Sequence, residues 1–160
     1  MLILPSTHTV HRQRGFSLVE VLIALVIMSV GMLGIAGLYV HSLQAGRTSQ
    51  FSHQAVTLAG DVADRIRANP TAGADYAGAG GANNACGGVA SNCDATAMAD
   101  SDIFLWKDQA QNTLPGGQVD VTYDDTTTPP QFTISVSWED PGSPGGETPS
   151  YDVTIPVNGA

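Results

Sequence analysis

The chain has 160 residues, of which 15 are acidic and six are basic, and its formal net charge is −9. Without Arg12 and Arg14 only four basic residues remain against the 15 acidic ones, so the side chains after Gly15 carry −11. Such a surface repels phosphate backbones and has no basic patch to release counterions. Composition therefore argues against nucleic acid as a partner, and the length leaves room for one modest domain.

The first element is a run of twenty residues without a charge, Val21 to Val40. Because about 18 or more apolar residues at ~1.5 Å each match a hydrocarbon core ~30 Å thick, the run predicts a helix that crosses a membrane once. Arg12 and Arg14 lie immediately before it, and basic residues beside a span stay in the cytoplasm. We therefore expect a cytoplasmic amino terminus and an external domain, which is periplasmic in a cell with two membranes.

Residues 1–14 are polar, end in basic residues and contain Pro5, which is typical of a leader rather than of a folded element. An ordinary secretory signal has its small-residue cleavage site after the apolar segment. Here no such site follows Val40, whereas Gly15 stands before the apolar run. The pattern indicates a leader whose removal leaves the apolar segment in the protein.

The segment from Arg14 to Glu20, RGFSLVE, resembles the class III processing site of type IV prepilins. The resemblance implies cleavage between Gly15 and Phe16 by the prepilin peptidase and N-methylation of Phe16. Residues 1–15 are then a leader peptide, and residues 16–40 are a transmembrane and assembly helix in the bacterial inner membrane. The implied partners are the prepilin peptidase, other minor and major pilins, the inner-membrane pilus assembly machinery and membrane lipid.

Glu20 is the one charged residue at the apolar end of this helix. A carboxylate in lipid costs on the order of a few kcal/mol unless it is paired or reaches the interface, so anchoring alone does not explain it. The resemblance implies that Glu20 meets the methylated amino terminus, Phe16, of a neighbouring subunit. Such a desolvated charge pair also fixes the axial register of the two helices.

Helical periodicity continues beyond the span without a helix breaker. Apolar residues recur every three or four positions, and they are Tyr39, Leu43, Phe51, Ala55, Leu58, Val62 and Ile66. Opposite charges follow at helical spacing, namely Asp61 with Arg65 and Asp64 with Arg67. The helix is expected to start at Phe16 and to end at Ala68, before the Asn69–Pro70 pair. At ~1.5 Å per residue it exceeds a bilayer, so residues 41–69 are its exposed half.

Residues 71–97 are rich in glycine, alanine and asparagine, and we expect one long loop there. Cys86 and Cys93 fall in this exported part, where disulfides persist. A zinc site needs further ligands at suitable spacing, and every histidine precedes residue 54. We therefore predict a disulfide between Cys86 and Cys93, and no metal.

The remaining segment predicts one short helix and a small sheet. Asp100 or Ser101 can cap a helix through about Thr113, with Ile103, Phe104, Trp106 and Ala110 on its packed face. Three alternating apolar runs follow, at 119–123, 132–138 and 151–157, with turn-rich segments between them. Together with the long helix they predict an α+β protein with the type IV pilin fold, in which residues 70–160 form the periplasmic globular domain around a three- or four-stranded antiparallel sheet.

Several distal features are similar to the PilV type of minor pilin, the type IV pilus modification proteins. These features are the segment from Asp64 to Pro70, the cysteine loop, the helix containing Phe104 to Trp106 and the turn from Leu114 to Gly117. The resemblance implies a structural subunit that primes pilus assembly and so supports twitching motility or adhesion.

No residue pattern indicates an enzyme, a cofactor or a catalytic site. Asp124 and Asp125, like Glu139 and Asp140, lie in predicted turns, where solvated carboxylates are usual. His41 and His53 are twelve residues apart, which is not the four-residue spacing of a helical metal pair. We therefore expect a non-enzymatic protein.

Two other functions share parts of this pattern. A minor pseudopilin of type II secretion has the same amino-terminal signal, although the Cys86 loop and the segment from Leu114 to Gly117 are not typical of it. A tip adhesin or a DNA-uptake module belongs to another class, and the acidity of the chain argues against direct DNA binding.

Overall fold

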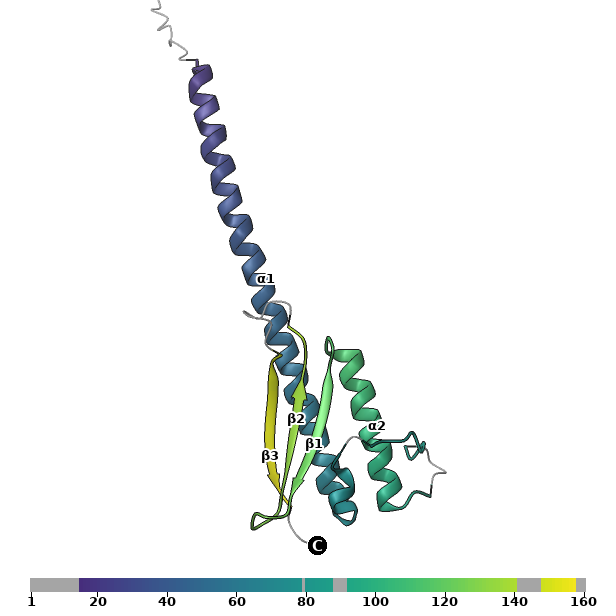
Figure 1. The fold of residues 1–160 in the computed structure, drawn as a ribbon. Helices are drawn as coiled ribbons and strands as arrows, with labels where there is room; N and C mark the ends of the chain where they lie inside the picture. The colour runs from purple at the N-terminus through teal and green to yellow at the C-terminus, as the bar shows by residue number, and fades with distance from the viewer. Residues whose placement is uncertain (1–14, 79, 88–91, 141–147, 158–160) are drawn as a thin grey trace, which may run out of the picture. The chain divides into compact units, whose positions relative to one another are not determined.

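The computed structural model describes residues 15–78, 80–87, 92–140 and 148–157. Its elements in chain order are α1 (Leu18–Ala68), the 3-10 helix η1 (Pro70–Tyr76), α2 (Ala95–Thr113), β1 (Gln118–Asp124), β2 (Gln131–Ser137) and β3 (Ser150–Pro156) (Figure 1). The chain divides into two compact units, Met1–Ser42 and Leu43–Ala160, and α1 contributes residues to both. The expected leader, residues 1–14, lies outside the described residues.

In the first unit, α1 is apolar and exposed on all sides. It contains a stretch long and apolar enough to cross a membrane, by length and composition, and none of that stretch is buried. The helix begins at Leu18 and not at Phe16 as expected, because the carbonyl of Ser17 accepts the first helical hydrogen bonds, from the N–H groups of Glu20 and Val21. Glu20 lies in the first turn, where a carboxylate interacts favourably with the helix dipole.

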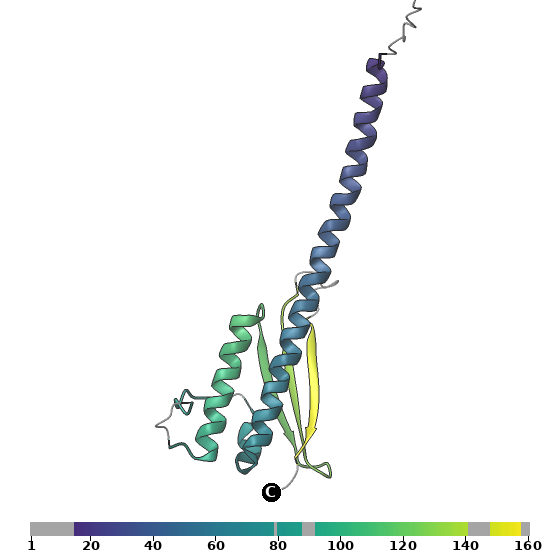
Figure 2. The ribbon, with the colours of Figure 1, turned by 180° about the vertical axis from the view of Figure 1, so that it is seen from behind.

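In the second unit, α1 buries one face against the sheet. The buried residues repeat at helical spacing, and they are Ala55, Leu58, Ala59, Val62, Ala63 and Ile66. They pack on the inner sheet residues Val119, Val121, Phe132, Ile134, Val136 and Ile155. The helix lies behind the strands in Figure 1 and in front of them in Figure 2. The second unit is therefore a helix layer on a sheet layer, and the predicted α+β class is confirmed.

The sheet has three antiparallel strands in the order β1-β2-β3. Apolar side chains alternate with polar ones along each strand, and every apolar set faces α1. The outer face is polar, with Asp120, Ser135 and Asp152 in one row and Thr122, Thr133 and Thr154 in the next. The three strands predicted from alternation are confirmed.

Helix α2 begins earlier than expected. Its cap is Asp94, whose side chain accepts a hydrogen bond from the N–H of Ala97 at 2.8 Å, so the predicted caps Asp100 and Ser101 lie inside the helix. Ile103, Trp106 and Ala110 are buried as predicted, but Phe104 is 37% exposed. The buried positions, spaced by three and four, form a single stripe, and a residue adjacent to Ile103 falls outside it.

The expected single loop over residues 71–97 is wrong at both ends, since η1 occupies its start and α2 its end. Pro70 opens η1 with a backbone conformation suited to a first helical turn. Ala72 and Tyr76 of η1 are buried, and the Tyr76 ring stacks on Trp106 at 5.6 Å between centroids. The segment therefore adds a large aromatic residue to the core.

The turn between α2 and β1 depends on two glycines. Gly116 has φ +58, a conformation that favours glycine, and a Cβ on Gly117 would collide with the backbone of Ala110. Leu114 is buried in this turn, and the carbonyl of Pro115 accepts a hydrogen bond from the N–H of Glu139 at 2.7 Å. The turn thus fixes the start of β1 against the end of β2.

Candidate functional site

The first candidate site lies at the start of α1, in the first unit. Phe16, just before α1, and Glu20, in its first turn, line a shallow apolar groove with Val21, Ala24, Leu25 and Met28. Phe16 is 83% exposed. Glu20 has no ion-pair partner within the part of the chain that the structure describes. Its carboxylate is therefore available to a group from outside the chain, and its pairing with an amino terminus stays a prediction.

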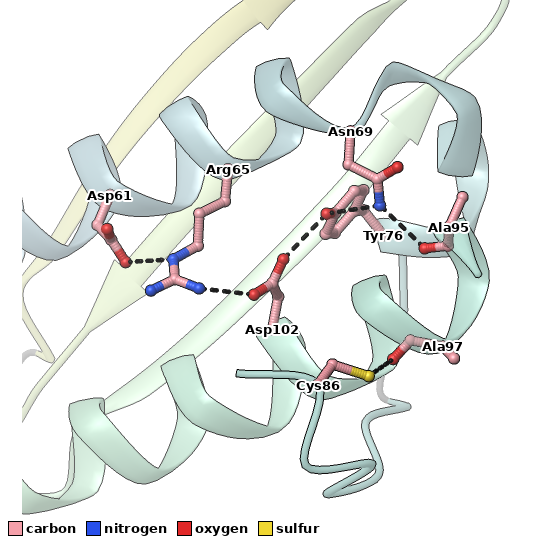
Figure 3. Close-up of polar contacts among 8 residues, drawn as sticks. All are labelled: Asp61, Arg65, Asn69, Tyr76, Cys86, Ala95, Ala97 and Asp102. Carbon is pink, nitrogen blue, oxygen red and sulfur yellow. Dashed lines mark hydrogen bonds and ion pairs between the residues drawn. The ribbon is translucent and has the colours of Figure 1, made fainter. Parts of the chain in front are cut away.

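The second candidate site is a polar network that joins α1 to α2, within the second unit (Figure 3). Arg65 donates to Asp61 at 3.1 Å and to Asp102 at 2.7 Å. The predicted helical pairs, Asp61 with Arg65 and Asp64 with Arg67, are thus confirmed. The side chain of Arg65 is 45% exposed and that of Asp102 only 6%, so the network runs from solvent into the core.

The buried end of the network is made by Tyr76 and Asn69. The Tyr76 hydroxyl donates to the second carboxylate oxygen of Asp102 at 3.0 Å, and Asn69 Nδ2 donates to the Tyr76 oxygen at 3.1 Å and to the carbonyl of Ala95 at 2.9 Å (Figure 3). Both carboxylate oxygens of Asp102 therefore accept a hydrogen bond. The network holds the end of α1, η1 and the start of α2 together.

Burial and nearby charges shift the pKa values of two groups in this network, Arg65 and Tyr76. Burial alone lowers the pKa of Arg65, but its hydrogen bond to Asp102 and the charge of Asp61 outweigh burial and raise the pKa. Burial raises the pKa of Tyr76 from 10.0 to about 12, and the negative charge of Asp102 acts in the same direction. The arginine stays charged and the tyrosine stays neutral, which is the state in which both donate hydrogen bonds to Asp102.

The shifted pKa of Tyr76 predicts a loss of stability in alkali. Because the folded pKa lies above the unfolded value, the stabilising contribution is fully present below pH 10 and is lost as the pH rises from 10 to about 12. We expect the free energy of unfolding of the full chain in detergent to fall across this window. The fall should be smaller in Tyr76→Phe, which has no group to titrate there. Urea unfolding at a series of pH values measures both, and equal slopes in the two proteins would contradict the assignment.

Cys86 and Cys93 form a disulfide, as predicted, with their Cα atoms 5.9 Å apart. The sulfur of Cys86 lies 3.5 Å from the carbonyl of Ala97, in the first turn of α2. A groove beside the bridge is lined by residues that include Cys93, Arg65, Asn69 and Asp102. The disulfide thus closes a short ring beside the polar network, where the loop-entropy model assigns it roughly 2–3 kcal/mol.

Two of the carboxylates expected in turns have structural roles that the sequence did not indicate, and one of them, Asp124, is the last residue of β1 rather than a turn residue. Asp124 accepts hydrogen bonds from the hydroxyl and the N–H of Thr126, which lower the pKa of that carboxyl. Asp140 accepts a hydrogen bond from the Thr48 hydroxyl of α1 at 2.7 Å. His41 and His53 are exposed. Across the residues that the structure describes, no group of three or more His, Cys, Asp or Glu is arranged to hold a metal ion.

Two family models match the chain. The model described as Prokaryotic N-terminal methylation motif matches residues 10–36, and the model described as Type IV pilin Tt1218 matches residues 37–104. No curated protein and no solved structure matches the chain. The first match covers the Arg14 to Glu20 segment, and the second covers α1 from residue 37 to its end, the disulfide loop and the first half of α2.

The fold and these matches define a pilin, a structural subunit with a long amino-terminal helix and a small antiparallel sheet. The chain carries a class III prepilin methylation motif and, directly after it, a type IV pilin family domain. The predicted family and fold are therefore confirmed at this level. The matches do not single out the PilV type.

Proposed function

We propose that the chain is a minor pilin of the PilV type, which enters a type IV pilus or the complex that primes its assembly. The observation that carries the proposal is the complete exposure of the apolar surface of α1 in the first unit. So large an apolar surface needs a nonaqueous environment, and both a bilayer and a bundle of pilin helices provide one. The features similar to PilV, including the cysteine loop and the turn from Leu114 to Gly117, support the subtype.

Maturation begins, in this proposal, with cleavage between Gly15 and Phe16 by the prepilin peptidase, followed by N-methylation of Phe16. The methylation-motif match over residues 10–36 supports this step. The anchor is retained because cleavage takes place ahead of it. The chain then spans the inner membrane once, with a cytoplasmic amino terminus and residues 70–160 in the periplasm, a topology that rests on Arg12 and Arg14.

Assembly moves α1 from lipid into the filament. Glu20 of one subunit pairs with the methylated amino group of Phe16 in another, and this pairing offsets the cost of holding an unpaired carboxylate in an apolar environment. The shared groove of Phe16 and Glu20 and the lack of an ion-pair partner for Glu20 in the described chain support this role. Other pilins are the partners, and no catalytic step is needed.

Replacing Gly15 by valine is expected to block maturation, because a branched side chain replaces the small residue at the cleavage site. The protein should keep its leader, and its amount in sheared pili should fall by on the order of 100-fold or more, as for loss of an essential processing step. Gly46→Val is the matched control, since Gly46 lies outside the motif and has open space around it. Mass spectrometry of the membrane fraction measures cleavage and methylation together. Mature mass and normal piliation in Gly15→Val would overturn the proposal.

A pseudopilin of type II secretion is separated from a pilin by the phenotype of a gene deletion. A pilin subunit predicts fewer surface pili and unchanged secretion of enzymes, whereas a pseudopilin predicts the reverse. Counting pili and assaying secreted enzymes in the same deletion strain measures both outcomes.

A further inference from the structure

The two edges of the sheet differ in their exposure. The β1 edge lies beside α2 and η1, and the carbonyl of Val121 in β1 accepts a hydrogen bond from Gly78 at 3.0 Å. The β3 edge lies on the side of the sheet away from α2 in both views (Figures 1 and 2). The sheet thus has one covered edge, at β1.

The hydrogen bonds that flank β3 show which of its backbone groups face outward. Trp138 N–H donates to the carbonyl of Pro149, and Val157 N–H donates to the carbonyl of Pro130. The backbone groups of residues 149 and 157 therefore face β2. The backbone N–H and carbonyl groups of the odd-numbered residues between them also face β2, because these groups alternate between the two sides of an antiparallel strand. The backbone N–H and carbonyl groups of the even-numbered residues of β3 therefore face outward, at the free edge of the sheet.

These outward positions are Ser150, Asp152 and Thr154, followed by Pro156. No described residue forms a hydrogen bond with the backbone N–H or carbonyl of the first three. A row of unpaired backbone groups is a template for another strand, and proteins usually protect it with lysine, proline or a bulge. Pro156 protects the end of β3, and Asp152 is the one charged side chain along the strand.

We propose that the β3 edge binds an extended strand from a different pilus subunit, with a cationic side chain of that strand beside Asp152. This inference rests on the proposed function, since it names a partner within the pilus. Pairing supplies backbone hydrogen bonds to Ser150, Asp152 and Thr154, and the side-chain row determines which strand fits. A fourth strand extends the three-stranded sheet by one.

The cross-strand row that contains Asp152 determines which charge the partner strand should carry. Asp120, Ser135 and Asp152 are aligned across the outer face, so an added strand places its own residue directly beside Asp152. The second unit cannot supply the compensating charge easily. Of its four basic residues, Arg65 and Arg67 already form ion pairs, and the amine of Lys107 donates to the carbonyl of Gly80. The fourth, Arg47, lies on α1, which packs on the opposite face of the sheet from Asp152. A cationic residue on the partner is therefore complementary.

A second copy of this chain fits the edge poorly. Antiparallel pairing of two β3 strands about Asp152 sets the two carboxylates directly opposite each other, and like charges at such positions are destabilising. The interface would also be two-fold symmetric, whereas a filament needs a head-to-tail contact. A different subunit is the better occupant.

Thr154→Pro tests the edge without removing any backbone hydrogen bond to β2, since the N–H of Thr154 faces outward. The hydrogen bond between the hydroxyls of Thr154 and Thr133, at 3.4 Å, is lost in Thr154→Ala as well, so that variant is the matched control. The chain already has a proline of the same orientation at Pro156. We expect the amount of Thr154→Pro in sheared pili to fall by about tenfold or more, with Thr154→Ala close to wild type. An intact Cys86 to Cys93 disulfide and wild-type protease resistance show that the variant is folded. Wild-type incorporation of Thr154→Pro would overturn the inference.

A charge reversal gives a second test that does not depend on proline. Asp152→Lys sets like charges side by side and should reduce incorporation by about tenfold. Asp120→Lys makes the same change two strands away in the same row and should have little effect. Equal effects of the two lysines would overturn the proposed pairing, because a general charge effect would then explain both.

A photo-crosslinking amino acid at position 154 identifies the occupant directly, with position 122 as the control on β1. A crosslink to another pilus subunit at position 154 alone supports the inference, and a crosslink to a second copy of this chain overturns it. If the wild-type chain is absent from pili, the proposed function fails and the inference with it. If the wild-type chain is present and the edge variants match it, only the inference fails.

Discussion

Asp102→Ala is expected to lower the free energy of unfolding by about 3 kcal/mol. The substitution removes the acceptor for two donors, Arg65 and the hydroxyl of Tyr76, and Tyr76 is completely buried. Leaving a buried donor unpaired costs ~1–3 kcal/mol, and the lost charge-assisted bond to Arg65 adds to this cost. Urea unfolding of the full chain in detergent, followed by the fluorescence of the two buried tryptophans, measures the change.

Asp61→Ala is the matched control for Asp102→Ala, because both carboxylates bind the same arginine. Asp61 and Arg65 are each more than 40% exposed, and exposed helical ion pairs contribute about 0.5 kcal/mol. The two substitutions should therefore differ several-fold in their cost. Similar costs would mean that Arg65 pairs with Asp102 no more strongly than with Asp61, and the network would then have no buried anchor.

Trp106→Ala is expected to have the largest effect of any single substitution in the core, about 3–5 kcal/mol. Trp106 is 1% exposed and its ring stacks on Tyr76, so truncation leaves a cavity between α2 and η1. Truncation also removes the indole ring on which Tyr76 stacks, and this contact helps to hold Tyr76 beside Asp102. Unfolding of this variant can be followed by the remaining tryptophan, Trp138, which is also buried.

Trp106→Phe separates packing from hydrogen bonding at this position. The indole nitrogen of Trp106 is buried and has no hydrogen-bond partner among the described residues, so its loss removes no bond. We expect a cost of about 1–2 kcal/mol, from lost volume alone. A cost equal to that of Trp106→Ala would contradict the packing explanation.

The regular elements could be predicted because their own sequences carry the period of the structure. In α1, Ala55, Leu58, Val62 and Ile66 repeat at helical spacing, and all four are buried. The alternation of Phe132, Ile134 and Val136 predicted β2 in the same way. Asn69 and Pro70 marked the end of α1 correctly. Each of these signals is local, so one sequence is enough to read it.

The start of α2 and the element η1 could not be predicted in the same way. Residues 71–97 have few large apolar side chains, and the burial of Tyr76 depends on Trp106, which lies 30 positions further along the chain. The cap of α2 was missed because Asp94, Asp100 and Ser101 are all good capping residues, and choosing among them requires knowing where the chain leaves the disulfide loop. An aromatic residue in an otherwise small and polar segment was the one signal present.

The two candidate sites differ in the same way, because one is contiguous in the sequence and the other joins distant residues. The motif from Gly15 to Glu20 is contiguous and could be read directly from the sequence. The polar network could be predicted only in part. Arg65 and Asp61 are four residues apart, whereas Arg65 and Asp102 are separated by 37. Nothing in the sequence near Asp102 distinguishes it from the other aspartates of the chain.

The scarcity of cations in the second unit also determines how its contacts respond to ionic strength. Carboxylates dominate this surface, and two of its arginines are already neutralised within the chain. Repulsion between acidic neighbours is screened by salt, with a Debye length of ~10 Å at 0.1 M, so contacts with another acidic subunit strengthen as salt is added. A contact with a cationic subunit weakens under the same conditions. The salt dependence of incorporation into pili therefore reveals the sign of the charge on the subunit beside it.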